Sequence, residues 1–288
     1  MQTNHQVHFP RQKLSKTHRE VILLLFWFFF VSTSAGAADS KILPMPKKIS
    51  EHVYAWIGPH GGPSTENKGF RMNMAFVVGG KSVAVIESGF YPAMAQEMLE
   101  QIKTITDLPV NYVINSNSQP DRFFGNDVFH GIGAQIIAHS KEIARMQENA
   151  NLNVMFIETS MKFPEGSVKI PKPPNKAIHS NITLDLGGGI SLAIHTYKAA
   201  HTPAPLIVHV PSDNVVYAGD ILYSGRLLAI VPGGNIKNWL ETFNYLKRFN
   251  SALFIPGHGN PDALASFQKS TYDYLEMLHR HMSKMVND

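Results

Sequence analysis

The chain has 288 residues, of which 44% are hydrophobic and 17% charged, so it is not a disordered protein and can bury one large or two small cores. Its net charge of +4 comes mainly from residues 1–38, which hold four of the 26 Lys and Arg and one of the 22 Asp and Glu, leaving 22 against 21 in residues 39–288. Since residues 39–288 also contain no long cluster of Lys and Arg, nothing indicates the concentrated basic face that nucleic acid requires, and the lack of cysteine excludes thiolate nucleophiles and ligands.

Residues 1–38 have the three parts of a secretory signal peptide. Basic residues precede the apolar run 21–31, and small residues follow, with an A-x-A cleavage signal at Ala35–Ala37. We therefore expect cleavage near Ala37 or Ala38, and export of residues 39–288 to the periplasm or the medium without a remaining membrane anchor. The alternative is an uncleaved anchor, because the apolar and small residues together approach the length that spans a bilayer.

The first half of the exported chain alternates apolar strands with helical patterns. The strands are predicted at 53–57, 74–78, 82–86, 110–114 and 134–138, and the helices at 92–104 and 140–149. The Gly79–Gly80 pair predicts a hairpin between the second and third strands. Ser140 is the expected cap of the second helix. A Gly/Pro-rich loop at 58–69 follows the first strand, and a polar loop at 115–126 leaves the fourth.

The second half begins again with strands and ends with helices. Its strands are predicted at 182–184, 190–197, 206–210, 215–218 and 253–255, and its helices at 236–249 and 262–281. Two such halves predict two sheets packed together with helices outside. Since no Pro/Ser linker separates the halves, we expect one domain over 39–288.

Polar residues follow predicted strands at four places. These are Asn117/Gln119/Asp121/Arg122, His201, Gly219–Asp220 and Pro256–Gly259. A single His after a strand is usually a hydrogen-bonded part of the scaffold. His and Asp residues at successive strand ends, in contrast, are typical of a metal site built along one edge of a sheet.

From about His52 to His281 these motifs resemble the metallo-β-lactamase-fold hydrolase superfamily. The pattern His-x-His-x-Asp-His, with Gly-Asn soon after, corresponds to Asn117-x-Gln119-x-Asp121-Arg122 with Gly125-Asn126, and the later motifs match as His201-Thr202-Pro203, Gly219-Asp220 and Gly257-His258-Gly259. The resemblance implies an α/β (α+β) fold, a four-layer αβ/βα sandwich of two mixed β-sheets with helices on the outer faces. It also shows that the first motif is degenerate, since its histidines are absent.

The resemblance implies two metal positions. In the superfamily the first metal is held by residues that correspond to Asn117, Gln119 and His201. Two neutral amides are poor ligands for zinc, whose protein donors are imidazole, thiolate and carboxylate. We therefore expect the first position to be weak or empty.

The second metal position keeps three of its ligands. They are Asp121, Asp220 and His258, while Arg122 stays protonated and cannot bind a metal. Three ligands are the minimum for a catalytic site with an open water position. The resemblance thus implies one zinc ion.

These residues predict a hydrolase that uses one divalent metal to activate water against an amide, ester, thioester or lactam carbonyl of a small molecule. In this hypothesis Asp121 orients the water or takes its proton. His201 acts as a base or as a donor to the developing oxyanion, and the amides of Asn117 and Gln119 polarise the carbonyl.

Two residues are expected on the substrate side. Arg122 favours an anionic substrate group, and His60 lies in the Gly/Pro-rich loop, where the superfamily has a substrate flap. The alternative is a catalytically inactive binding or scaffold protein on the same fold, with an empty metal site in which Asn117, Gln119 and Arg122 hydrogen-bond to one another and to Asp121. The sequence leaves the substrate, the metal and the oligomeric state open.

Overall fold

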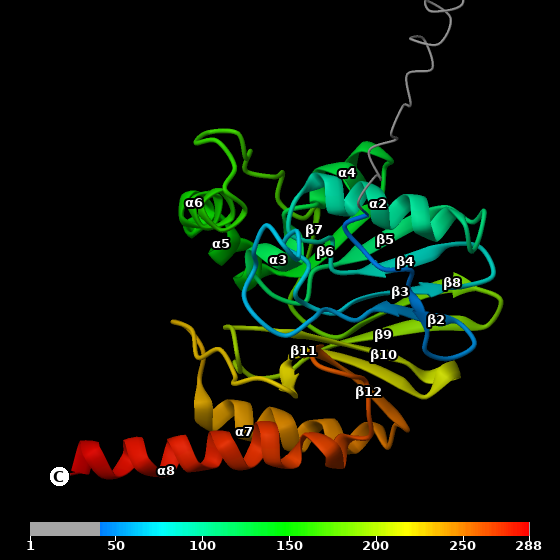
Figure 1. Cartoon of the computed structure of the whole chain (residues 1–288). Helices are drawn as coiled ribbons and strands as arrows, with labels where there is room; N and C mark the ends of the chain where they lie inside the picture. The colour runs from blue at the N-terminus through cyan, green and yellow to red at the C-terminus, as the bar shows by residue number, and fades with distance from the viewer. Residues whose placement is uncertain (1–40, 288) are drawn as a thin grey trace, which may run out of the picture. The chain divides into compact units, whose positions relative to one another are not determined.

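The computed structural model describes residues 41–287, so the predicted signal peptide at 1–38 lies outside the described residues. Two β-sheets face each other and helices flank them on the outside (Figure 1). In this described part of the chain, no helix combines the length and the apolar character that a membrane span requires.

The first sheet has seven strands in the order β1-β2-β3-β4-β5-β6-β7. They are β1 (Lys47–Lys48), β2 (Val53–Trp56), β3 (Met74–Val78), β4 (Val83–Ile86), β5 (Val110–Ile114), β6 (Gln135–His139) and β7 (Lys176–Ile178). The strands from β1 to β4 pair antiparallel, with the predicted hairpin between β3 and β4. Those from β4 to β7 pair parallel, so their carboxyl ends meet at one edge.

The second sheet has five strands in the order β12-β11-β10-β9-β8. They are β8 (Ile182–Gly187), β9 (Ile190–Thr196), β10 (Leu206–Val210), β11 (Val215–Tyr223) and β12 (Leu253–His258). Only β11 and β12 pair parallel, and the other pairs are antiparallel. Both sheets are therefore mixed, as the sequence predicted.

The α-helices are α2 (Pro92–Lys103), α3 (Pro120–Phe123), α4 (Asn126–Gly131), α5 (Ser140–Glu148), α6 (Ala150–Met161), α7 (Ile236–Leu246) and α8 (Tyr274–Asn287). Short 3-10 helices are η1 (Pro211–Asp213), η2 (Lys247–Phe249) and η3 (Leu264–Phe267), and η4 (Gln268–Asp273) is a π-helix before α8. Helices α2 and α4 lie outside the first sheet, and α7 and α8 lie outside the second (Figure 1).

Three apolar cores separate these four layers. The first includes Met94 and Met98 of α2 and the outward side chains of the first sheet. The second fills the space between the sheets, and the third packs Trp239 and Phe243 of α7 against the second sheet. Because each sheet buries both of its faces, the chain has the predicted αβ/βα sandwich.

The local predictions were wrong at four places. The final helix, predicted over 262–281, is α-helical only from Tyr274, because η3 and η4 precede α8. The polar run 115–126 is a loop only in its first half, because Pro120 at the first helical position starts α3. Strand β11 does not end at residue 218 but continues through Gly219 and Asp220, paired with β12. His139, and not Ser140, caps α5, with its Nδ1 accepting from the amide of Lys141 at 3.1 Å.

Elements β1, β7 and α6 had no counterpart in the sequence prediction. The two strands have only two and three residues, too few for an alternating pattern. In α6, Leu152 and Met155 are exposed while Ile157 is buried. Apolar residues on several sides of a helix weaken the 3.6-residue period by which a helix is recognised.

Candidate active site

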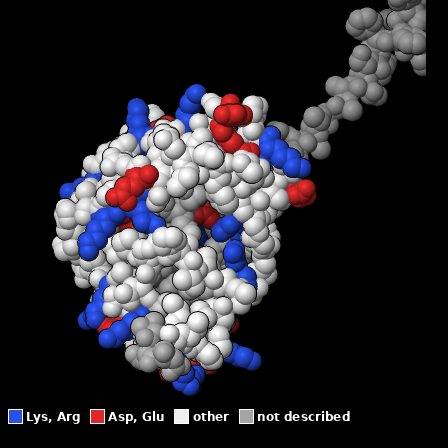
Figure 2. All heavy atoms as spheres, turned by 90° about the vertical axis from the view of Figure 1, so that its left-hand side faces the viewer, with Lys and Arg blue, Asp and Glu red and all other residues white. Residues whose placement is uncertain are grey.

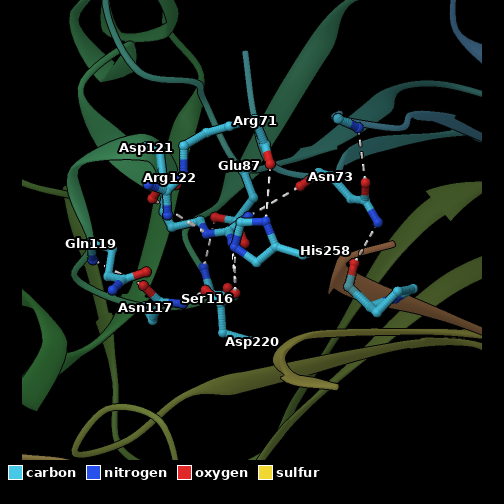
Figure 3. A network of polar contacts seen from close by, with 12 residues as sticks. Arg71, Asn73, Glu87, Ser116, Asn117, Gln119, Asp121, Arg122, Asp220 and His258 are labelled. Carbon is cyan, nitrogen blue, oxygen red and sulfur yellow. Dashed lines mark hydrogen bonds and ion pairs between the residues drawn. The ribbon is translucent and has the colours of Figure 1, made fainter. Parts of the chain in front are cut away.

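Six of the predicted site residues come together in one polar network (Figure 3). Asn117 and Gln119 lie in the loop after β5, and Asp121 and Arg122 lie in α3; β11 supplies Asp220, and the last residue of β12 is His258. His201 lies between β9 and β10 and is fully buried. Side chains far apart in the sequence thus meet where the topology predicts.

Two glycines place the Asp220 carboxylate. Gly219 has φ +55°, and the pairing of β11 with β12 shifts register on both sides of it, so a bulge turns the next side chain into the site. A Cβ atom on Gly257 would lie 2.2 Å from Asp220 Oδ1. Only glycine at position 257 therefore lets the strand pass this close to the carboxylate.

Both oxygens of Asp220 accept hydrogen bonds from side chains of the chain. Arg122 donates from a terminal nitrogen to Oδ1, and Asn117 donates from Nδ2 to Oδ2, each at 2.8 Å. Burial raises the pKa of Asp220, but the guanidinium of Arg122 and, to a smaller extent, the other polar neighbours of the carboxylate together outweigh burial and hold the pKa well below its usual range. Asp220 is therefore a buried, fully paired anion.

Arg122 is the counter-ion of the site, and no part of it is exposed. Its second terminal nitrogen donates to the carbonyl of Asn73 at 3.2 Å, and its Nε lies 3.7 Å from Asp121 Oδ1. Burial lowers the pKa of Arg122, but Asp220 and Asp121 raise it well above its ordinary value. The guanidinium therefore lies charged between two carboxylates.

Asp121 is held by ion pairs and not by hydrogen bonds. Its Oδ2 lies 3.3 Å from Nε of Arg71, and its side chain is almost entirely buried. Within residues 41–287, neither oxygen of Asp121 has a hydrogen-bond partner. Both oxygens are thus unused acceptors at the centre of the site.

The two histidines are buried. His258 donates from Nδ1 to the carbonyl of Arg71 at 2.9 Å, which leaves Nε2 3.4 Å from Asp220 Oδ1. Burial lowers the pKa of His258 to about 4, against the pull of Asp220. Burial also lowers the pKa of His201, whose ring lies 5.4 Å from that of Trp239. Both imidazoles are neutral at pH 7.

The side chains of Asn117 and Gln119 lie within the network, whereas His60 lies outside it. Asn117 uses both ends of its amide, since Oδ1 accepts from the Gln119 backbone amide at 2.9 Å while Nδ2 binds Asp220. In the described part of the chain, Oε1 of Gln119 has no partner. His60 is exposed and packs against Gly225, outside the network of Figure 3.

Sequence reasoning missed Asn73, which links the network to two neighbouring loops. Its Oδ1 accepts from the amide of Gly58, and its Nδ2 donates to the carbonyls of Pro256 and Gly259. Its own carbonyl accepts from Arg122 and from Tyr217. The only signal in the sequence is a polar residue directly before the wholly apolar strand β3.

Arg71 and Glu142 were missed as well. Glu142 of α5 is fully buried, and its two oxygens accept from the amides of Ser118 at 2.9 Å and Ala204 at 2.6 Å. It therefore joins the loop after β5 to the loop after His201. An acid on a short helix normally indicates a solvated face, so nothing in the sequence marked it.

The superfamily's zinc can be tested against these residues. Within residues 41–287, no three His, Asp or Glu side chains stand close enough together to hold one metal ion. Both oxygens of Asp220 are already bound by donors, and one of these donors is a cation. As arranged, the residues do not fit a divalent metal, because a guanidinium occupies the position of positive charge.

Comparisons with known families, sequences and structures all find metallo-beta-lactamases, in agreement with the two-sheet fold. Residues 69–258 match the family described as the metallo-beta-lactamase superfamily. The metallo-beta-lactamase IND-1 of Chryseobacterium indologenes is 26% identical over 241 residues, 80% of this chain and 90% of that protein. The structure of a metallo-beta-lactamase from Pontibacter korlensis superposes with a TM-score of 0.65 at 17% identity, over 80% of this chain and 98% of that one. The crystal structure of metallo-beta-lactamase IND-7 superposes with a TM-score of 0.60 at 20% sequence identity, over 75% of this chain and 90% of that one.

Proposed function

The chain belongs to the metallo-β-lactamase superfamily, and we propose that it uses the superfamily's site as a metal-free pocket that binds a small polar molecule without hydrolysing it. The observation that carries this proposal is the double pairing of Asp220, whose two oxygens accept from Arg122 and Asn117. Each oxygen of this carboxylate already accepts from a side chain, and the cationic donor on Oδ1 competes with a metal for that oxygen. The fold supplies the pocket, while these residues decide its chemistry.

The unused groups of the pocket favour a ligand that donates hydrogen bonds. Asp121 Oδ1 and Oδ2, Gln119 Oε1 and His258 Nε2 are buried acceptors without a hydrogen-bond partner among the described residues. Buried acceptors left unpaired are costly. The charges already balance, since Asp121 and Asp220 face Arg71 and Arg122. Hydroxyl or N–H groups of a ligand would satisfy the acceptors.

An anionic ligand, which the sequence suggested, would have to use the buried Nε atoms of Arg71 and Arg122, which have no hydrogen-bond partner among the described residues but lie beside Asp121, and this carboxylate repels an anion. The terminal nitrogens of Arg122 are committed to Asp220 and to the Asn73 carbonyl. On the side where α3 and α5 lie, the surface is hollowed, and acidic and basic side chains stand together inside the hollow (Figure 2). A mixed lining of this kind does not select an anion.

A single-metal hydrolase acting on an amide, ester, thioester or lactam is the second candidate. One observation favours it: His258 presents Nε2 towards Asp220 while Nδ1 donates to a backbone carbonyl. This is how a ligating histidine is usually oriented. The two candidates therefore differ in one measurable quantity, the metal content of the wild-type protein.

Metal content and turnover test the two candidates together. Tag-free protein is exposed to zinc, desalted and analysed by mass spectrometry, and it is assayed with a chromogenic lactam and a thioester. We expect less than about a tenth of an equivalent of zinc and no turnover. One equivalent of zinc that disappears in Asp220→Ala and His258→Ala would contradict the metal-free pocket, and turnover that both substitutions abolish would establish the hydrolase instead.

Ligand chemistry is tested with three four-carbon probes in a thermal shift assay. Butane-1,4-diol and 1,4-diaminobutane carry donors, while succinate carries only acceptors at neutral pH. We expect one or both donor probes to raise the melting temperature and succinate to leave it unchanged, with the effect lost in His258→Ala. Stabilisation by succinate alone would contradict the proposed ligand class.

We also propose that residues 1–38 are removed on export, because their basic, apolar and small-residue segments follow the pattern of a signal peptide. N-terminal sequencing of protein from the periplasmic fraction should start at Ala38 or Asp39. An intact N-terminus in the membrane fraction would support the uncleaved anchor.

A further inference from the structure

We propose that the chain has a second ligand site, a cavity between the start of α5 and the loop before β10, which binds a small molecule through an oxyanion such as a phosphate group. The cavity has a volume of about 560 Å³, which is within the range of small-molecule sites. We call it the α5 cavity, and the lining residues that bear on its ligand are His139, Ser140, Lys141, His179, Tyr197 and Lys198. None of the residues labelled in Figure 3 lines it, so the inference is independent of the function proposed above.

The lining of the α5 cavity is basic. It contains two lysines and two histidines, and none of the described residues that line it is Asp or Glu. Two acids lie behind the lining, but both are already used: Glu241 pairs with Lys198, and the buried Glu142 accepts from backbone amides. Lys141, in contrast, forms no ion pair with any described residue. A ligand in the cavity therefore meets an ammonium group without a counter-ion, which favours an anion.

His139 adds a hydrogen-bond donor of fixed position. Its side chain is 7% exposed, and its Nδ1 accepts from the amide of Lys141 at 3.1 Å. Burial, with smaller effects of Lys141 and His179, lowers the pKa of His139, so the ring is neutral at pH 7. Because Nδ1 accepts, the neutral ring carries its proton on Nε2. No described residue accepts from this N–H group, which leaves it available to an oxygen of the ligand.

Two further features beside His139 favour a negative group. Helix α5 begins at Ser140, so the positive end of its dipole lies at the cavity. The hydroxyl of Ser140 lies 2.9 Å from Nδ1 of His179, and the rings of His139 and His179 are 6.2 Å apart. Two imidazoles thus border the same space, and a bound anion would favour the protonated form of either ring.

The α5 cavity also has an aromatic wall. Tyr197 is 44% exposed, and its ring stacks on that of Tyr245 with the centroids 4.1 Å apart. The stacking holds the ring in place, so Tyr197 offers the cavity a rigid apolar surface. An oxyanion attached to a small organic group, such as a phosphate monoester, would use both the basic and the aromatic part of the lining.

Inorganic phosphate and phenyl phosphate are the probes that test this site. Wild-type protein with ¹³C-labelled histidine is titrated with each probe, and with sodium chloride at equal ionic strength to match the screening of charge. The NMR signals of His139 and His179 are assigned with His139→Asn and His179→Asn. We expect phenyl phosphate, and not chloride, to shift both signals. A shift with inorganic phosphate as well would show that the free anion is sufficient for binding.

His139→Asn separates the helix cap from the proposed donor. Asn is a favoured N-cap residue whose Oδ1 can accept from the amide of Lys141, but it has no group at the position of Nε2. We expect the melting temperature to stay within about 2 °C of wild type, while the affinity for phenyl phosphate, followed by the His179 signal, falls about tenfold.

Two lysine variants test the charge of the lining. Lys141→Gln removes the unpaired ammonium group and should weaken binding of phenyl phosphate at least about threefold. Lys176→Gln is the matched control, because Lys176 is an exposed lysine of the neighbouring strand β7 outside the lining, and it should leave the affinity unchanged. If neither probe shifts the two histidine signals, or if His139→Asn and Lys141→Gln both bind phenyl phosphate as wild type does, the inference is overturned.

Discussion

Replacing Glu142 by Gln tests whether one carboxylate fastens the two loops that carry the site. Glu142 is fully buried and accepts from the amides of Ser118 and Ala204, one in each loop. Gln has the same shape, but it offers one acceptor and one donor group. One of the two amides would then face an NH₂ group and remain without an acceptor.

The expected cost follows from these two bonds. Hydrogen bonds to a charged group contribute about 1.5–3 kcal/mol each. The variant loses one of them and converts the other to a weaker neutral bond, while relief from burying a charge offsets part of the loss. We expect the free energy of unfolding to fall by about 3 kcal/mol, equivalent to roughly 6–12 °C in melting temperature for a chain of this size.

Urea unfolding followed by circular dichroism measures this difference, and Glu158→Gln is the matched control. Glu158 is also buried, but it accepts from only one backbone amide, that of Val168 at 3.0 Å, and Gln can keep this bond with its single oxygen. The control should lose less than about 1 kcal/mol. Equal losses in the two variants would refute the claim that a doubly used carboxylate joins the loops.

Three further substitutions probe how the site is built. Gly257→Ala places a Cβ atom 2.2 Å from Asp220 Oδ1, so calorimetry should show that the free energy of unfolding falls by at least about 3 kcal/mol. A fall of less than about 1 kcal/mol would mean that strand β12 shifts to make room for the Cβ atom. Burial raises the pKa of Glu87 to about 7 although Arg122 opposes this. The folded state therefore keeps the proton of Glu87 to a higher pH than the unfolded state, and the free energy of unfolding should fall by roughly 2.5 kcal/mol between pH 5 and 8. Glu87→Gln should remove this fall, and a pH profile that the substitution leaves unchanged would contradict the assignment. Asn73→Ala leaves three buried main-chain groups without partners and should cost about 3 kcal/mol in urea unfolding, whereas a neutral result would show that water replaces the amide.

The strands and helices were largely predictable because their causes are local. Strands β2 and β3 are short apolar runs, apolar residues alternate with polar ones in β9, and they repeat with helical spacing in α2 and α7. Each pattern reflects which faces of the element are buried. The failures also have local causes. Strands of two or three residues are too short for a pattern, and Pro120 reads equally well as a loop residue or as the start of a helix.

The site could be predicted as a set of residues but not as an arrangement. The order of the motifs predicted that Asp121, Asp220 and His258 lie near one another, and Figure 3 shows them in one polar network, while their role as metal ligands stays a prediction. The sequence could not say that Arg122 faces Asp220 as well as its neighbour Asp121, since 98 residues separate Arg122 from Asp220. Arg71 and Glu142 could not be found at all, because their roles depend on burial.

By itself the sequence determined the superfamily and the two-sheet architecture, since these depend on residue type, periodicity and order. Only the tertiary structure decided which group neutralises Asp121 and Asp220. Whether a buried carboxylate binds a metal or a guanidinium depends on which cation lies within about 3 Å of it in a medium of low dielectric constant. Packing between the two sheets sets that distance, and here it places Arg122 against Asp220 at 2.8 Å.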